Sequence, residues 1–121
     1  MVVPKKTLTL FLQNNELRTL VGMAEVLEVV MWNSRNLLWL DLSYNFLQSI
    51  DEELLNFPEI KTLYLHGNYI ANLEHTKKLQ KFEDLQSLTL YGNPIEQVKG
   101  YRMYVLGVMY QNNNQNLRRL D

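Results

Sequence analysis

Three residue types that together perform nucleophilic catalysis occur in equivalent segments of this sequence. Ser43 and His66 each stand two residues before an asparagine, and Asp41 stands two residues before the serine. If the two segments form neighbouring strands, the serine and histidine side chains lie within about 5 Å of each other. A serine beside a histidine and a carboxylate is the combination that acyl-transfer enzymes use. These three residues therefore form a candidate catalytic site.

The arrangement lacks two requirements of a catalytic triad. The acid must orient the far side of the histidine, and an oxyanion hole must lie nearby. Asp41 instead belongs to the serine's own segment, and an open sheet offers no enclosed hydrogen-bond donors. We therefore expect no enzymatic activity and no catalytic residue.

Other ligand chemistry also has little support in the sequence. His75 has no partner at metal-ligand spacing. Gly67 and Gly92 each precede an asparagine where a strand must bend, and neither belongs to a glycine-rich phosphate loop. The arginines near the C-terminal end are too few for a basic stripe: Arg102, Arg118 and Arg119. We expect no metal, no cofactor, no small-molecule substrate and no nucleic-acid partner.

The asparagines belong to a motif that occurs four times. It reads LxxLxLxxN, followed two residues later by another aliphatic residue, over residues 7–17, 37–47, 60–70 and 85–95. Its asparagines are 30, 23 and 25 residues apart and form the expected asparagine ladder: Asn15, Asn45, Asn68 and Asn93. A period near 23 with this motif is the signature of a leucine-rich repeat solenoid. The expected fold class is α/β, with a short parallel sheet on the concave face, short helices and turns on the convex side, and a C-terminal helical cap.

Each motif position has a physical task. The aliphatic residues at the first, fourth and sixth positions point into the core, and alternation leaves the positions between them facing solvent. The asparagine has donor and acceptor atoms, so it can bind backbone groups that the bend after a strand leaves unpaired. Stacked repeats are therefore expected to bury all four ladder asparagines in one column.

The solvent-facing positions of the motif predict a binding surface. Ser43 belongs to these positions, as do several aromatic residues. Aromatic residues are enriched in the hot spots of protein interfaces, so we expect protein partners. The predicted partner-binding residues on the concave face are Phe11, Trp39, Asp41, Tyr64, His66 and Tyr91.

The segments between the motifs predict short helices on the convex side. Residues 21–32 form the longest segment, and Val26, Leu27, Val30 and Met31 suit one buried helical face. Residues 51–57 predict a turn of helix, with Ser49 and Glu52 spaced as a capping box.

The C-terminal part predicts a cap. Residues 101–110 have helical spacing, residues 111–116 form a polar loop, and the motif begins again at 117–121. A last strand there leaves an open sheet edge, which predicts that the chain continues or that a partner covers it. The expected organisation is one domain, 1–121, with repeats near 7–36, 37–59, 60–84 and 85–99 and a cap, 100–121, that contains Tyr101, Arg102 and Tyr104.

Composition limits the class of protein. The chain has 121 residues, 46% of them hydrophobic, a net charge of −1 and no cysteine. The absence of cysteine favours a reducing, cytoplasmic environment. The first residues do not have the pattern of a secretory signal, and no apolar run approaches the ~18 residues of a transmembrane helix. We expect no membrane partner.

The sequence resembles a known group of proteins at four segments: 36–51, 63–70, 85–106 and 117–121. The group is the short intracellular leucine-rich repeat proteins with a C-terminal cap, and the likeness is greatest to a ciliary member. This resemblance implies a structural or docking subunit of the ciliary axoneme, in a doublet-microtubule-associated or radial spoke assembly. Other members imply the alternative, a soluble regulatory adaptor of a phosphatase or ribonucleoprotein complex.

Overall fold

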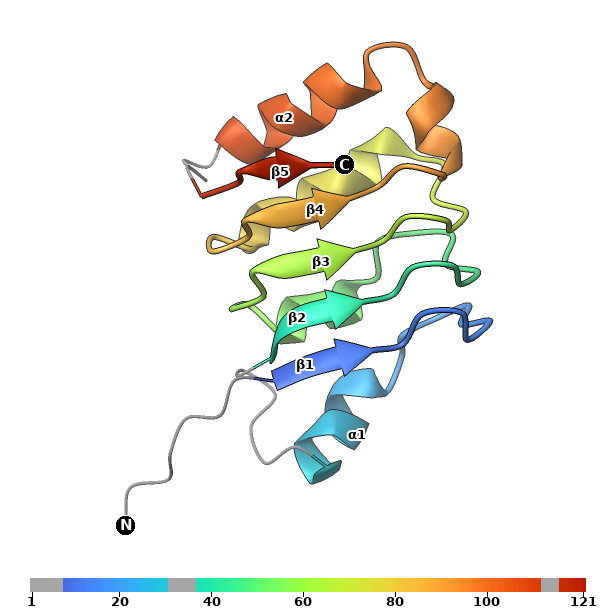
Figure 1. The fold of residues 1–121 in the computed structure, drawn as a ribbon, viewed down its shortest axis with the longest axis vertical. Helices are drawn as coiled ribbons and strands as arrows, with labels where there is room; N and C mark the ends of the chain where they lie inside the picture. The colour runs from blue at the N-terminus through green and yellow to red at the C-terminus, as the bar shows by residue number, and fades with distance from the viewer. Residues whose placement is uncertain (1–7, 31–36, 112–115) are drawn as a thin grey trace.

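The computed structural model describes residues 8–30, 37–111 and 116–121. Within them, five parallel strands form one sheet whose spatial order follows the chain. Figure 1 shows the strands stacked one above another, with helical segments behind them. The strands are β1 (Leu8–Phe11), β2 (Leu37–Asp41), β3 (Thr62–Tyr64), β4 (Ser87–Thr89) and β5 (Arg119–Leu120). The expected fold class, a leucine-rich repeat solenoid, is confirmed.

Equivalent motif positions lie side by side in the sheet. Leu40 pairs with Leu63, which pairs with Leu88, and all three are fully buried. Asp41 pairs with Tyr64 in the adjacent row. Because side chains alternate along a strand, the leucine row points into the core and the adjacent row points away from it. This register decides which residues share the solvent-facing side.

Helical segments connect the strands on the other side of the sheet. The first connection contains an α-helix, the next two contain 3₁₀ turns, and the last contains a 3₁₀ turn followed by the cap helix. The segments are α1 (Met23–Val30), η2 (Glu52–Asn56), η3 (Leu73–Lys81), η4 (Pro94–Gln97) and the cap helix α2 (Tyr101–Gln111).

Helix α1 differs from the prediction at Val26 of the expected apolar face. Leu27 is buried, but Val26 is 60% exposed. Adjacent residues of a helix point about 100° apart, so Val26 and Leu27 face different directions. The first repeat has no described repeat before it that could cover Val26. The carboxylate of Glu53 accepts a hydrogen bond from the N–H of Ala24 at 2.9 Å, at the positive end of the helix. The side chain of Val30 and the whole of Met31, both part of the predicted face, lie outside what the structure describes, as do residues 112–115 of the predicted polar loop.

The predicted capping box at the next helical turn is wrong. The N-cap of η2 is Asp51, not Ser49, and its carboxylate accepts the N–H of Glu53 at 2.9 Å. The other carboxylate oxygen accepts the N–H of Leu20 at 3.0 Å. A carboxylate reaches two backbone donors in different repeats, so Asp51 both starts η2 and fastens the first repeat to the second.

Buried asparagines connect consecutive repeats, as Asn68 illustrates. Its Oδ1 accepts the N–H of Leu47 at 3.1 Å, and its Nδ2 donates to the carbonyls of Leu42 and Leu65 at 3.0 Å each. Leu65 belongs to the same repeat, and Leu42 and Leu47 belong to the preceding one. Two further ladder residues are buried and make equivalent bonds: Asn45 and Asn93.

Asn15 does not share this environment. It is exposed, and among the described residues its Nδ2 donates only to the nearby carbonyl of Gln13, at 3.1 Å. Each buried ladder asparagine reaches back to the preceding repeat, and the first repeat has none in the described residues. The expectation that all four ladder asparagines are buried is therefore wrong at Asn15.

The cap helix α2 packs against η3 and η4 at the C-terminal end of the stack (Figure 1). Tyr101 is buried, and its hydroxyl donates a hydrogen bond to the carboxylate of Asp121. Arg102 donates to the carbonyl of Leu120 at 2.9 Å, and Tyr104 is half-buried. The helix is thus bound through side chains to the end of β5.

The ladder predicts a stability difference between two asparagines of the same motif. Asn68→Ala leaves two carbonyls and one N–H without their buried partner, so we expect the free energy of unfolding to fall by about 1–3 kcal/mol. Asn15→Ala is the matched control and should change it little, because that side chain is exposed. Denaturant titration of both variants measures this. Equal losses at the two sites would contradict the ladder's stabilising role.

The cap predicts a solubility difference. Removal of residues 100–121 takes away α2 and β5, which leaves the β4 edge and the buried side chains of Leu88 and Leu90 exposed. Solenoids depend on capping elements for solubility, so the truncated chain should aggregate. Size-exclusion chromatography and thermal unfolding check this. A monomeric truncated chain that unfolds cooperatively would contradict it.

Candidate binding face

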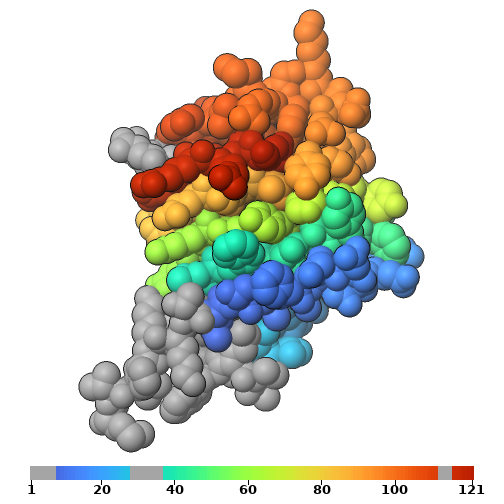
Figure 2. Space-filling view, in the orientation of Figure 1, coloured from blue at the N-terminus to red at the C-terminus, as the bar shows by residue number. Residues whose placement is uncertain are grey.

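The residues predicted to bind a partner lie on the sheet face opposite the helices, here called the concave face. Figure 2 looks onto this face, where successive repeats form parallel bands. The register places Phe11 beside Asp41 and Asp41 beside Tyr64 across three strands. The six residues differ in exposure: Phe11 59%, Trp39 39% and Tyr91 39%, with Asp41, Tyr64 and His66 half-buried.

Four rings on this face form a continuous row. Trp39 and Tyr64 meet edge to face, with centroids 5.6 Å apart. Tyr64 contacts His66 at 5.8 Å, and His66 stacks on Tyr91 at 4.5 Å with planes 9° apart. Such pairs contribute roughly 0.5–1.5 kcal/mol beyond their area burial. The row is therefore held in place before any ligand arrives.

Tyr44 joins this row although the alternation of the strand does not select it. Its ring meets His66 edge to face at 5.2 Å and is 53% exposed. The residue has a φ of 55°, and the equivalent positions in the next two repeats are Gly67 and Gly92, also with positive φ. A Cβ on Gly67 would lie 2.4 Å from the Tyr44 ring, so only glycine leaves room for it there. Alignment of the repeats would have shown that Asn14 and Tyr44 occupy the position that is glycine in the two later repeats, and that only Tyr44 places an aromatic ring there.

Ser43 is buried rather than solvent-facing, which corrects the prediction for this position. Both its N–H and its hydroxyl donate to Oδ1 of Asp41, at 2.9 and 2.6 Å. The aspartate closes an Asx turn where the chain leaves β2. His66 bonds instead through Nδ1 to the hydroxyl of Thr89 at 2.7 Å. The three residue types of a triad are thus paired in other ways, and nothing here points to catalysis.

The environment of His66 favours its neutral form. Partial burial lowers the pKa of the imidazole below its ordinary value of 6.5, and the negative charges of Asp41 and Asp121 oppose this shift in part. A neutral ring stacks on Tyr91 and bonds to Thr89 without adding a positive charge to the face. At neutral pH the centre of the concave face is therefore aromatic and, through Asp41, negatively charged.

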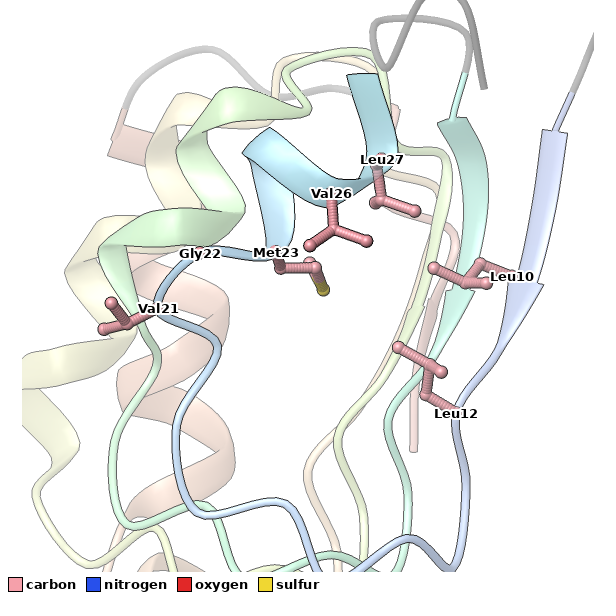
Figure 3. A pocket seen from close by; sticks show the side chains of 7 residues that line it. All are labelled: Leu10, Leu12, Val21, Gly22, Met23, Val26 and Leu27. Carbon is pink, nitrogen blue, oxygen red and sulfur yellow. The ribbon is translucent and has the colours of Figure 1, made fainter. Parts of the chain in front are cut away.

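A cavity of about 330 Å³ lies between α1 and β1. Figure 3 shows Leu10 and Leu12 on the strand side and Met23, Val26 and Leu27 on the helix side. All of these side chains are apolar. The cavity belongs to the first repeat, where the core has no described repeat before it, and none of its lining residues has a polar side chain to orient a ligand.

The described part of the chain provides neither a metal site nor a helix that could span a membrane. No group of three or more His, Cys, Asp or Glu side chains there is arranged to hold a metal ion. Nδ1 of His75 is buried without a hydrogen-bond partner in that part of the chain, and a single imidazole does not make a metal site. The helices within these ranges are too short or too polar to span a bilayer.

The burial of His66 predicts how it titrates. Because burial disfavours the charged form, its pKa in the folded state should lie below 6.5. Stability is then unaffected above pH 6.5 and falls as the pH drops from 6.5 through the folded-state pKa. Asp41→Asn removes a charge that raises this pKa and should lower it further. NMR titration of the imidazole measures both values; a midpoint at or above 6.5 would contradict the assignment.

The sequence is similar to known proteins over most of its length. The profile of Leucine Rich repeats (2 copies) matches residues 35–78. Leucine-rich repeat-containing protein 51 of Rattus norvegicus and that of Homo sapiens are each 47% identical over 100 residues, which is 83% of this chain and 52% of the relative. Leucine-rich repeat-containing protein 23 of Xenopus tropicalis is 36% identical over 71% of this chain and 23% of its own length. The chain thus spans about half the length of the first of these relatives.

Solved structures share the fold at lower sequence identity. A leucine-rich repeat protein of Leptospira interrogans has a TM-score of 0.65 and 23% identity, over 91% of this chain and 24% of that one. The structure of the Chaetomium Mex67:Mtr2 subunits has a TM-score of 0.64 and 22% sequence identity, over 83% of this chain and 70% of that one. Together with the repeated motif, the parallel sheet and the asparagine ladder, these similarities show that the chain belongs to the leucine-rich repeat family.

Proposed function

We propose that this chain is a non-enzymatic scaffold that holds a segment of a partner protein on its concave face. The observation that carries the proposal is the row of partly exposed rings centred on Trp39 and Tyr64, which contact each other at 5.6 Å. Rigid aromatic side chains bind with little loss of conformational entropy and are frequent hot spots. The flanking residues complete the surface: Phe11, Asp41, His66 and Tyr91.

The size of the face limits what it can hold. Five strands at ~4.8 Å spacing give a width of about 19 Å, and a strand of five residues is about 17 Å long. The area is on the order of 300 Å², whereas a stable interface buries ~800 Å² per partner. The face therefore suits one helix of 10–12 Å diameter or one extended strand. Lasting attachment therefore needs further contacts outside this face. This favours a subunit that several proteins of a large assembly contact at the same time.

Within this proposal, the assembly is the ciliary axoneme, and the chain is a structural or docking subunit there. The resemblance of segments such as 85–106 and 117–121 to a ciliary repeat protein supports this choice. Fractionation tests it: an axonemal subunit remains with detergent-extracted cilia. Release into the soluble fraction would reject the axoneme and favour the alternative, a regulatory adaptor of a phosphatase or ribonucleoprotein complex.

The concave-face proposal predicts opposite effects at two adjacent residues. Trp39→Ala should weaken association with the partner by about 2 kcal/mol or more and barely change the free energy of unfolding, because the ring lies outside the core. Leu40→Ala should lose about 2–5 kcal/mol of stability, because that side chain is fully buried. Crosslink mapping of the purified assembly and denaturant titration measure the two effects.

Thr62→Ala serves as the control for association, since Thr62 lies beside Trp39 in the register but carries no ring. It should leave incorporation unchanged. Normal incorporation of folded Trp39→Ala would mean that the partner binds another surface.

A further inference from the structure

We propose that the concave face recognises an arginine side chain of the partner segment, with Asp41 as its anion. This rests on the proposed function and specifies the chemistry of the partner. The guanidinium would bond to the Asp41 carboxylate and lie against the rings of Phe11, Trp39 and Tyr64.

Asp41 stands among three aromatic residues. The register places Phe11 of β1 on one side of it and Tyr64 of β3 on the other. Trp39 precedes it by two residues on the same strand and so points to the same face. Both hydrogen bonds from Ser43 end on Oδ1 of Asp41. Among the described residues, Oδ2 accepts no hydrogen bond, which leaves it for a ligand.

The charge of this carboxylate is not balanced nearby within the described chain. No ion pair with Asp41 is found among residues 8–30, 37–111 and 116–121. Arg119 lies on the same face but in β5, three strands from β2, about 14 Å away at ordinary strand spacing. That is beyond a Debye length at physiological salt, about 8 Å. At neutral pH His66 is uncharged, because burial lowers its pKa below 6.5. A partner cation would therefore meet an unpaired, half-buried anion.

Arginine suits this site better than lysine or an apolar residue. Its guanidinium is planar and weakly hydrated, stacks on aromatic rings and donates several N–H bonds in a fixed geometry. The faces of tryptophan and tyrosine attract cations. Lysine carries a compact and strongly hydrated charge, and an apolar residue would leave the carboxylate desolvated without a partner. The chain itself contains such a stack, with Cζ of Arg18 5.4 Å from the centroid of the Phe46 ring.

A displayed library of random twelve-residue peptides provides the test. The full chain and its Trp39→Ala variant serve as baits, and peptides that bind only the first report on the concave face. These peptides should share an arginine at one fixed position. For the tightest of them, replacement of that arginine by its neutral isostere citrulline should weaken binding about tenfold or more, and replacement by lysine should weaken it several-fold.

The protein-side variant is Asp41→Asn. Its amide oxygen can still accept both hydrogen bonds from Ser43, so the fold should survive, and circular dichroism checks this. Affinity for the arginine peptide should fall about tenfold, while affinity for the citrulline peptide stays the same. Binding of the arginine peptide to Asp41→Asn should also depend less on salt concentration than binding to the unchanged protein. Asp41→Arg should reject the arginine peptide and bind the version with glutamate at that position.

The outcomes separate the two proposals. Peptides that require Trp39 but share no arginine, or that bind equally well with citrulline, overturn the arginine inference and leave the concave-face proposal standing. A library that yields no Trp39-dependent peptide overturns the concave-face proposal, and the arginine inference falls with it. Arginine selection that persists in Asp41→Asn shows that the rings alone hold the cation and overturns the assignment to Asp41.

Discussion

The structure depends on one constraint: the backbone groups at the bend after a strand must find hydrogen-bond partners, and a ladder asparagine supplies them within its own repeat and to the preceding one. The buried ladder asparagines meet it. Asn68 binds one N–H and one carbonyl of the preceding repeat and one carbonyl of its own, all within 3.1 Å. An unpaired buried amide costs about 1–3 kcal/mol, so the bend cannot shift relative to its neighbour without a large penalty. The ladder thereby fixes the register of the strands.

The register in turn creates the concave face. Once Leu40, Leu63 and Leu88 form the buried row, the residues next to them must face solvent in an equally regular row. The rings of the continuous row on that face come from three repeats, and rings of neighbouring repeats meet because the repeats align. Tyr44 adds a ring from a bend rather than a strand, and Gly67 of the next repeat leaves the space that it occupies. Ring contacts across repeats then make the surface rigid.

The ends of the stack obey the same constraint in different ways. At the C-terminal end α2 covers the last repeat, and Tyr101 and Arg102 bind residues at the end of β5. At the other end Asn15 has no preceding repeat among the described residues, and a cavity of about 330 Å³ remains between α1 and β1. The interior repeats consequently have a neighbouring repeat packed on each side. Trp39, Asp41 and Tyr64, on which the proposed recognition depends, belong to those repeats.

The sequence alone determined the fold, because the spacing of leucines and asparagines repeats a physical requirement in every copy. It also determined which residues flank one another on the concave face, since a strand alternates and the copies align. Only the tertiary structure decided the exceptions, each through contacts between repeats. Ser43 is turned inward because its N–H and hydroxyl both donate hydrogen bonds to the Asp41 carboxylate. Asp51, rather than Ser49, is the cap of η2, and its carboxylate also accepts the N–H of Leu20. Asn15 stayed exposed because burial of a ladder residue depends on a preceding repeat, which the motif itself does not encode.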